Sequence, residues 1–201
     1  MANSRTVIFV AGPTASGKTT LVKRLANQGV AYIEESRRNP YFSVRSGDSF
    51  DAESSQHWFL DQIATFVRDH VKGILVIDQH PLVVSRVYGA MFFNKRLLSK
   101  SRLGRLDRSA NRIVEELSAP RTRSLTVCLS ASTNTLAKRL RRRKRNGLSS
   151  AEVKMVNELY STVVFPGPCL PMNTDVVTVE REITAVHCWL DDPGHCGWIG
   201  S

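Results

Sequence analysis

One short stretch carries the residue types best suited to chemistry on phosphates. The sequence VIFVAGPTASGKTTLVKRLA, residues 7–26, matches the pattern G-x-x-x-x-G-K-[ST] between an apolar run and a helix-like run. Small residues there let backbone N–H groups approach phosphate oxygens, and the positive end of the following helix points at the same oxygens. We expect Lys18 to contact the β- and γ-phosphates of ATP and the Thr19 hydroxyl to bind Mg²⁺. The predicted ATP-binding residues of this loop are Gly12, Pro13, Thr14, Ala15, Ser16, Gly17, Lys18, Thr19 and Thr20.

Acidic residues at the ends of two strand-like runs could complete such a site. The run GILVID places Asp78 at the end of an apolar segment. Carboxylate and hydroxyl oxygens are preferred ligands of Mg²⁺, so we expect Asp78 and Thr19 to share the ion. Glu34 and Glu35 follow another apolar run. Either carboxylate could accept the proton of an alcohol that attacks the γ-phosphate.

A basic segment follows in the second half of the chain. Residues 138–145, KRLRRRKR, contain seven basic side chains in eight positions. On a helix, Arg139 and Arg143 share a face through their i, i+4 spacing. That face could close as a lid, over about residues 139–149, and its guanidinium groups would neutralise charge on a triphosphate. The same run is also compatible with a solvated basic helix or with a grip on a nucleic-acid strand.

These groups need elements that bring them together. Strand-like runs rich in Val, Ile and Leu lie at 6–11, 30–34, 74–78, 125–129 and 176–179. Helix-length stretches lie between and after them, at 18–27, 52–71, 82–93, 109–117, 133–146 and 149–164, the last opening with a capping-box pattern. The alternation predicts an α/β fold, a single domain over residues 1–201 whose five-stranded parallel sheet is flanked by helices. Residues 181–201 are expected to form a C-terminal tail.

Composition limits the class of protein further. The chain has 201 residues, a net charge of +10 and no apolar stretch long enough to span a bilayer. Its first residues lack the pattern of a signal peptide, so we expect a cytoplasmic protein without a membrane partner. The four cysteines predict a reducing environment rather than a disulfide framework. A zinc site near the end of the chain stays open, although the spacing of its four candidate ligands is unusual for a zinc finger: His187, Cys188, His195 and Cys196.

Taken in order, several stretches resemble the deoxyribonucleoside kinase family, which phosphorylates the 5′-hydroxyl of deoxynucleosides. YIEESRRNPYF places Glu34 at the family's distance from an Asn-Pro-Tyr sequence at 39–41. SSQHWFLDQIATF carries Gln56 where the family has a glutamine that contacts the base, and VIDQHP keeps the acid at the strand end. The basic segment and the helix after it follow the family's lid. The resemblance runs from residue 7 to about residue 179.

This resemblance implies roles for particular residues. Glu34, with Glu35 as the alternate, would be the base that accepts the proton of the acceptor hydroxyl. Tyr41 and Gln56 would bind the nucleoside, and Arg139 and Arg143 would act on the phosphates of ATP. The resemblance also implies Mg²⁺ as the metal and a homodimer built on helices.

The sequence departs from the family pattern after the strand-end acid. Gln79 and His80 stand where the family has Arg and Ser, and no acid lies between Gln79 and Ala90. Arg86 could replace the missing arginine from one or two helical turns away. The acceptor therefore stays open between a nucleoside, a nucleoside monophosphate and another small alcohol.

Two other kinds of protein share parts of this pattern. The loop text GPTASGKT also occurs in isopentenyl transferases, but their further acid and glutamine motifs are not found here. A nucleic-acid-binding NTPase would use the basic segment to hold a strand. Few aromatic residues interleave with that segment, so nucleic acid is not expected as a partner.

Overall fold

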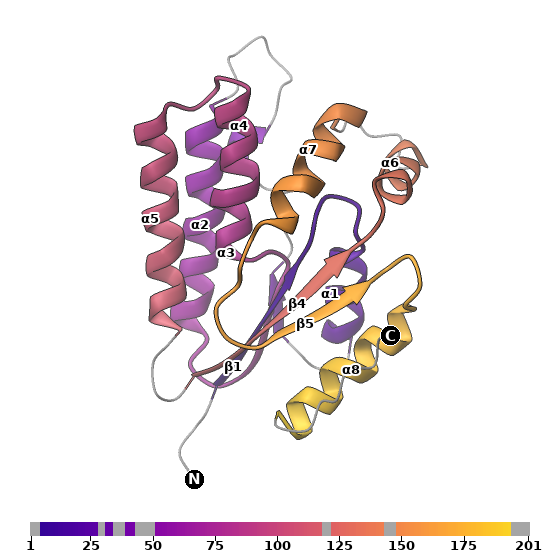
Figure 1. Cartoon of the computed structure of the whole chain (residues 1–201). Helices are drawn as coiled ribbons and strands as arrows, with labels where there is room; N and C mark the ends of the chain where they lie inside the picture. Colours follow the sequence, from indigo (N-terminus) through magenta and orange to yellow (C-terminus); the bar gives the residue numbers. More distant parts are fainter. Residues whose placement is uncertain are drawn as a thin grey trace.

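Parallel strands form one sheet in the computed structural model, which describes residues 5–27, 31–33, 39–42, 51–117, 122–142 and 148–193 (Figure 1). In spatial order, the described strands are β2 (Ala31–Ile33), β3 (Gly73–Ile77), β1 (Arg5–Ala11), β4 (Thr122–Ser130) and β5 (Cys169–Asn173). Residues 6–11 of β1 are all buried, because other strands flank β1 and helices cover both faces of the sheet. A strand buried on both faces needs an unbroken apolar run, which VIFVA supplies.

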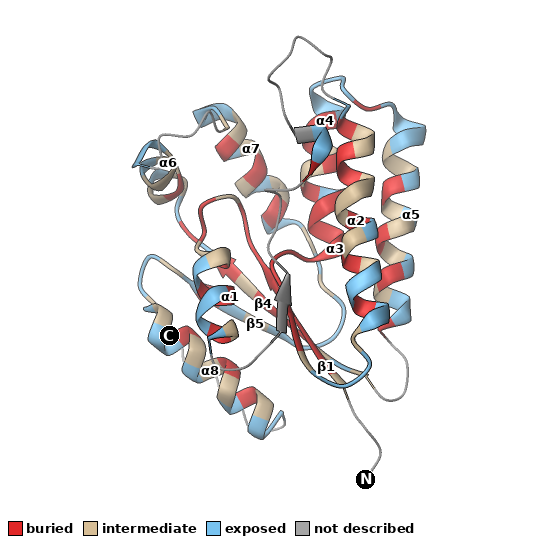
Figure 2. Cartoon of the chain, turned by 180° about the vertical axis from the view of Figure 1, so that it is seen from behind, coloured by how far each residue is buried: buried red, intermediate tan, exposed pale blue. Residues whose placement is uncertain are grey.

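Helices cover the two faces and form two hydrophobic cores. On one face, Ile8 and Val10 of β1 pack against α1 (Lys18–Ala26) and α8 (Val179–Asp191). On the other, Val7 and Phe9 pack in a larger core with six helical segments: α2 (Ala52–Asp69), α3 (Pro81–Val83), η2 (Val84–Gly89), α4 (Ala90–Asn94), α5 (Lys100–Glu116) and α7 (Ser150–Ser161). Figure 2 shows the buried residues gathered on the sheet and on the inward sides of these helices.

Three shorter or outlying elements lie toward the carboxyl end of the sheet. They are η1 (Pro40–Phe42), α6 (Thr133–Arg142) and α7 (Ser150–Ser161). In Figure 1, α6 and α7 lie beyond the tips of β4 and β5, on the same side as the loop between β1 and α1. The predicted capping box is confirmed: the Ser149 hydroxyl accepts the Glu152 N–H at 3.3 Å, and the Glu152 carboxylate accepts the Ser149 N–H at 2.7 Å.

The predicted α/β class and the first four predicted strands are confirmed, but the fifth strand was placed wrongly. Residues 176–179 do not form a strand, and Val176 is 74% exposed. The strand at this edge is β5, seven residues earlier. Its sequence CLPMN lacks a β-branched run, and Met172 alone is buried within it. Its proline is tolerated because β5 is an edge strand. The place of β5 in the chain is therefore determined by its pairing with β4, and its own residues give little indication of a strand.

Two helices were also misjudged. The expected tail at 181–201 instead contains most of α8, which begins after the N-cap Thr178 and buries Val186 and Trp189. Helix α5 begins at Lys100, nine residues before the predicted start, with Ser99 as its N-cap. Few of its positions are buried, and they lie among many charged residues. The helical period of apolar residues was therefore difficult to recognise in the sequence.

Two cysteines pair across neighbouring strands. Cys128 of β4 and Cys169 of β5 form a disulfide, so the expectation of reduced cysteines was wrong for this pair. Cys188 is free and exposed.

The described residues contain no group of three metal-ligating side chains, and His195 and Cys196 of the suggested zinc site lie outside them. No helix in the described ranges is long and apolar enough to cross a membrane.

Candidate active site

The loop between β1 and α1 has the tight backbone that a phosphate cradle requires. A Cβ at Gly12 would overlap Ser16 Oγ and lie 2.9 Å from the Leu129 carbonyl oxygen, so a side chain there cannot fit without movement. Gly17 has φ 111° and Ala15 has φ 70°, both in the left-handed region. Glycine adopts that region freely, whereas alanine does so at an energetic cost. The loop therefore has a strained backbone that wraps closely.

Lys18 lies inside this loop. Its side chain is buried, and Nζ donates hydrogen bonds to the carbonyl oxygens of Gly12 at 3.0 Å and Pro13 at 3.3 Å. The ammonium group thus lies against carbonyl oxygens of its own loop. This position fits the predicted contact with phosphate oxygens.

The predicted pair of magnesium ligands is brought together. Thr19 Oγ1 donates a hydrogen bond to Asp78 Oδ2 at 2.7 Å, which joins the first turn of α1 to the end of β3. Asp78 is buried at 3% exposure, so its carboxylate is held in place by the sheet. A hydroxyl and a carboxylate oxygen at this separation match the donor chemistry that Mg²⁺ prefers.

Arg139 of the basic segment reaches the phosphate loop. Its guanidinium donates to the carbonyl oxygens of Ala15 at 3.3 Å and Ser16 at 3.4 Å, and to Thr174 Oγ1 at 2.9 Å. A fourth bond, at 2.8 Å, goes to the Thr174 carbonyl oxygen. Arg139 therefore ties α6, the phosphate loop and the turn after β5 together. Arg143, its predicted partner in the lid, lies outside the described residues.

A buried carboxyl group lies behind this arginine. Glu182 of α8 is 3% exposed. Burial raises its pKa to about 7, although the positive charge of Arg139 acts in the opposite direction. This carboxyl group with a raised pKa is thus close enough to feel the charge of an arginine that contacts the phosphate loop.

The acceptor side is described in part. Glu34, Glu35 and their predicted role as base lie outside the described residues, and β2 ends at Ile33, level with Ile77 of β3. Tyr41, at 46% exposure, belongs to η1. Gln56 is buried in the first turns of α2, at 3% exposure.

Asn39 fixes η1 against the start of α2. Its Nδ2 donates to the Ser55 carbonyl oxygen and to Ser55 Oγ, both at 3.1 Å. Its Oδ1 accepts the Tyr41 N–H at 2.9 Å. The Asn-Pro-Tyr sequence is thus used to position Tyr41 beside the helix that carries Gln56.

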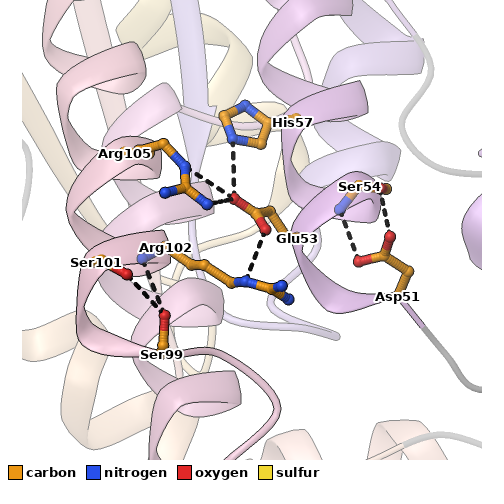
Figure 3. A network of polar contacts seen from close by, with 8 residues as sticks. All are labelled: Asp51, Glu53, Ser54, His57, Ser99, Ser101, Arg102 and Arg105. Carbon is orange, nitrogen blue, oxygen red and sulfur yellow. Dashed lines mark hydrogen bonds and ion pairs between the residues drawn. The ribbon is translucent and has the colours of Figure 1, made fainter.

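An ion-pair network holds the same end of α2 against α5 (Figure 3). Glu53 of α2 pairs with Arg105 at 2.7 Å and with Arg102 at 3.2 Å, both from α5. Asp51 caps α2 by accepting the Ser54 N–H at 3.1 Å, and hydrogen bonds from Ser54 lower the pKa of Asp51. Figure 3 shows the two contact groups on opposite sides of the helix start, so this turn is restrained from both directions.

Arg86 does not take the place of the arginine that is missing after Asp78. Its guanidinium donates to Asp107 Oδ1 at 3.0 Å and to Asn111 Oδ1 at 3.1 Å, so it is directed at α5. Arg86 lies in η2, a π-helical segment whose wider turn changes which residues share a face. An ordinary helical period could not have predicted this orientation, and we leave Arg86 out of the site.

Sequence reasoning missed Tyr88 of the same segment. Its hydroxyl lies 2.7 Å from Thr14 Oγ1, which joins η2 directly to the phosphate loop. The two residues are 74 positions apart in the chain, and no local motif predicts their contact. The only available signal was the aromatic residue in the segment after Asp78.

Comparison with known proteins places this geometry in a family. The AAA domain model matches residues 8–154, a range that includes the phosphate loop, Asp78 and α6. The chain belongs to the AAA domain family. The match covers most of the sheet and the helices of the larger core, and it agrees with the phosphate-loop class predicted from the sequence. None of the curated proteins matched the chain in sequence.

Solved structures extend the likeness of this AAA domain to nearly the whole chain. Deoxyadenosine kinase from M. mycoides with bound dCTP has 17% sequence identity and a TM-score of 0.69, over 93% of this chain and 98% of that chain. The same enzyme with dATP has 18% identity and a TM-score of 0.68, over 94% and 100% of the two chains. Its form with the products dCMP and dCDP has 16% identity and a TM-score of 0.67, over 93% and 98%. The fold is therefore that of a deoxyadenosine kinase, as the resemblance to deoxyribonucleoside kinases predicted.

Proposed function

We propose that the protein is an ATP-dependent phosphotransferase that moves the γ-phosphoryl group of ATP to the 5′-hydroxyl of a nucleoside or deoxynucleoside. The observation that carries this proposal is the contact of Thr19 with Asp78, next to a loop whose carbonyl oxygens accept hydrogen bonds from Lys18. The fold shared with deoxyadenosine kinases supports the nucleoside as acceptor.

On the donor side, backbone N–H groups of residues 12–20 would surround the phosphate oxygens, and Lys18 would exchange its carbonyl partners for the β- and γ-phosphates. Thr19 and Asp78 would hold Mg²⁺, which neutralises charge on the same phosphates when it is bound. Arg139, and Arg143 beyond it, would add positive charge from the basic segment.

On the acceptor side, the 5′-hydroxyl oxygen would attack the γ-phosphorus. A bond forms between these two atoms, the bond from the γ-phosphorus to the ADP oxygen breaks, and the hydroxyl proton passes to a carboxylate. Glu34 is the proposed base, with Glu35 as the alternate. Gln56 and Tyr41 would contact the nucleoside, from the end of α2 that Asn39 and Glu53 hold in place.

A nucleoside monophosphate kinase is the second candidate. Its acceptor pocket would need positive charge for the acceptor phosphate, and Arg37 and Arg38 follow the proposed base in the sequence. A nucleic-acid-binding NTPase is less favoured, because Arg139 is engaged with carbonyl groups of the phosphate loop and of Thr174.

The test is a panel of acceptors incubated with ATP and Mg²⁺, with ADP release as the readout. The panel contains the common nucleosides and deoxynucleosides, their 5′-monophosphates, and single- and double-stranded polynucleotides. We expect ADP release to depend on at least one nucleoside. Turnover with monophosphates alone, or stimulation by polynucleotides alone, would replace the proposal with one of the two alternatives.

A further inference from the structure

Gln79 combines two features that are unfavourable unless a ligand compensates for them. Its φ is 147°, in a region that a side chain other than glycine rarely adopts. Its side chain is buried at 3% exposure, and neither Nε2 nor Oε1 has a hydrogen-bond partner within the residues that the structure describes. Buried amide groups are nearly always hydrogen-bonded, so an amide with both ends unpaired calls for an explanation.

The residues on either side hold Gln79 in this conformation. Asp78 is bonded to Thr19 of α1. The His80 ring packs 4.7 Å from the ring of Phe9 and 4.8 Å from that of Phe165, and its Nδ1 accepts the Leu82 N–H at 3.1 Å. Gln79 is therefore fixed by its neighbours between the proposed metal site and the larger core.

The position of Gln79 points to the acceptor rather than to ATP. Strand β3 lies between β2, whose sequence leads into Glu34, and β1, which leads into the phosphate loop. Ile77 is level with Ile33 on one side and with Phe9 on the other. The chain leaves β3 at the carboxyl edge, where ligands bind in open parallel sheets. Gln79 thus follows the strand that separates the proposed base from the proposed donor.

We propose that the Gln79 amide binds the acceptor alcohol and restricts the acceptor to an uncharged nucleoside. The inference rests on the proposed function and deepens it. An amide can donate to and accept from a hydroxyl at once, which matches the needs of an alcohol. A phosphate dianion needs positive charge to be buried, and a neutral amide supplies none. Among the described residues of this segment, Arg86 supplies none either, because it is directed at α5.

Closure of the site follows from the same observation. Both polar atoms of the Gln79 amide are buried from solvent. An acceptor that binds these atoms must therefore displace the groups that cover the amide, and it then lies in the same enclosed place. Enclosure keeps water from competing for the γ-phosphoryl group.

Two variants test this assignment. Gln79→Met keeps the length of the side chain and removes the amide, and Gln79→Gly removes the side chain and relieves the φ of 147°. We expect both to melt at or above the temperature of the wild type, because no partner in the described structure loses a hydrogen bond. We expect kcat/KM for the best nucleoside to fall at least about tenfold, while KM for ATP changes by less than about twofold. Gln62→Met, on the half-buried part of α2, is the matched control and should change neither value.

The outcomes separate this inference from the function on which it rests. If both variants kept the kcat/KM of the wild type for the nucleoside, the role of Gln79 would be overturned. A clear fall in the melting temperature of both variants would also overturn it, because it would reveal a structural partner for the amide. Wild-type protein that phosphorylates only monophosphates would overturn the restriction to uncharged acceptors while leaving the kinase chemistry intact. Wild-type protein that turns over no acceptor at all would overturn the proposed function itself.

Discussion

The donor side and the acceptor side of the candidate site are built in different ways. The donor side is nearly contiguous: residues 12–20 form the loop and the start of α1, and Asp78 joins them through one hydrogen bond. The proposed acceptor side would draw on η1, α2, the end of β3 and η2, with η1 joined to α2 by contacts such as Asn39 with Ser55. A donor site formed by one segment can be combined with different acceptor sites, because residues of the acceptor side can change without disturbing the donor side.

A pair of hydroxyl groups also joins the two sides. Thr14 of the phosphate loop contacts Tyr88 of η2 at 2.7 Å. Changes on the donor side should therefore abolish reaction with every acceptor. Changes at the junction or on the acceptor side should alter rate or specificity by smaller amounts.

The largest effect should follow from Lys18→Ala. Loss of the ammonium group removes the charge that we propose faces the phosphates in the transition state, so kcat should fall at least about a hundredfold with any acceptor. Lys23→Ala, an exposed position of the same helix, is the control and should retain activity. Steady-state kinetics on both variants decides the matter, and equal losses in the two would remove Lys18 from the donor site.

Asp78→Asn should weaken the use of metal. The amide keeps the size of the side chain but lacks the charge, so the Mg²⁺ concentration for half-maximal activity should rise about 10- to 100-fold. A magnesium titration of activity measures this, with Asp61→Asn on the surface of α2 as the control. An unchanged magnesium requirement in Asp78→Asn would contradict the assignment of this carboxylate.

Glu182→Gln should change the pH dependence of stability. The pKa of Glu182 is raised from 4.5 to about 7 by burial, so the folded state favours the protonated acid. In the wild type, the stability that the protonated carboxyl group allows is fully present below about pH 4.5 and is lost as the pH rises to about 7. The glutamine variant should remove that loss, which raises the free energy of unfolding at pH 8 by up to about 2 kcal/mol after allowance for screening.

Urea denaturation at pH 5 and pH 8 measures this difference. The exposed residue Glu116 on α5 gives the control variant Glu116→Gln, which should follow the wild type at both values. A Glu182→Gln variant that loses stability at pH 8 would show that the ionised carboxylate has a stabilising partner.

The smallest effect should come from the junction itself. Tyr88→Phe removes a hydroxyl that shares a neutral hydrogen bond with Thr14, a loss of about 1 kcal/mol or roughly fivefold in kcat/KM. Thr14→Val should have a similar effect, and the double variant should lose little more than either single one. Fully additive losses in this cycle would mean that the two hydroxyls act independently and that the two sides are not coupled here.

The same contrast explains what could be predicted from the sequence. The placement of Gly12, Lys18 and Thr19 in one loop could be predicted because it depends on spacing within one segment, and that of Asp78 because an acid at the end of an apolar strand has a defined position. Tyr88 was missed and Arg86 misplaced because a π-helical turn changed the face on which each residue lies. Strand β5 was misplaced because its partner, β4, defines it more than its own composition does.

The most direct test of the account follows a labelled phosphate from ATP. Wild-type protein is incubated with γ-³²P-labelled ATP, Mg²⁺ and the best nucleoside of the panel, in parallel with the Lys18→Ala variant, and the products are separated by chromatography. The account predicts label on the 5′-oxygen of the nucleoside with the wild type and none with the variant. Label recovered only as inorganic phosphate, or only on a monophosphate acceptor, would contradict it.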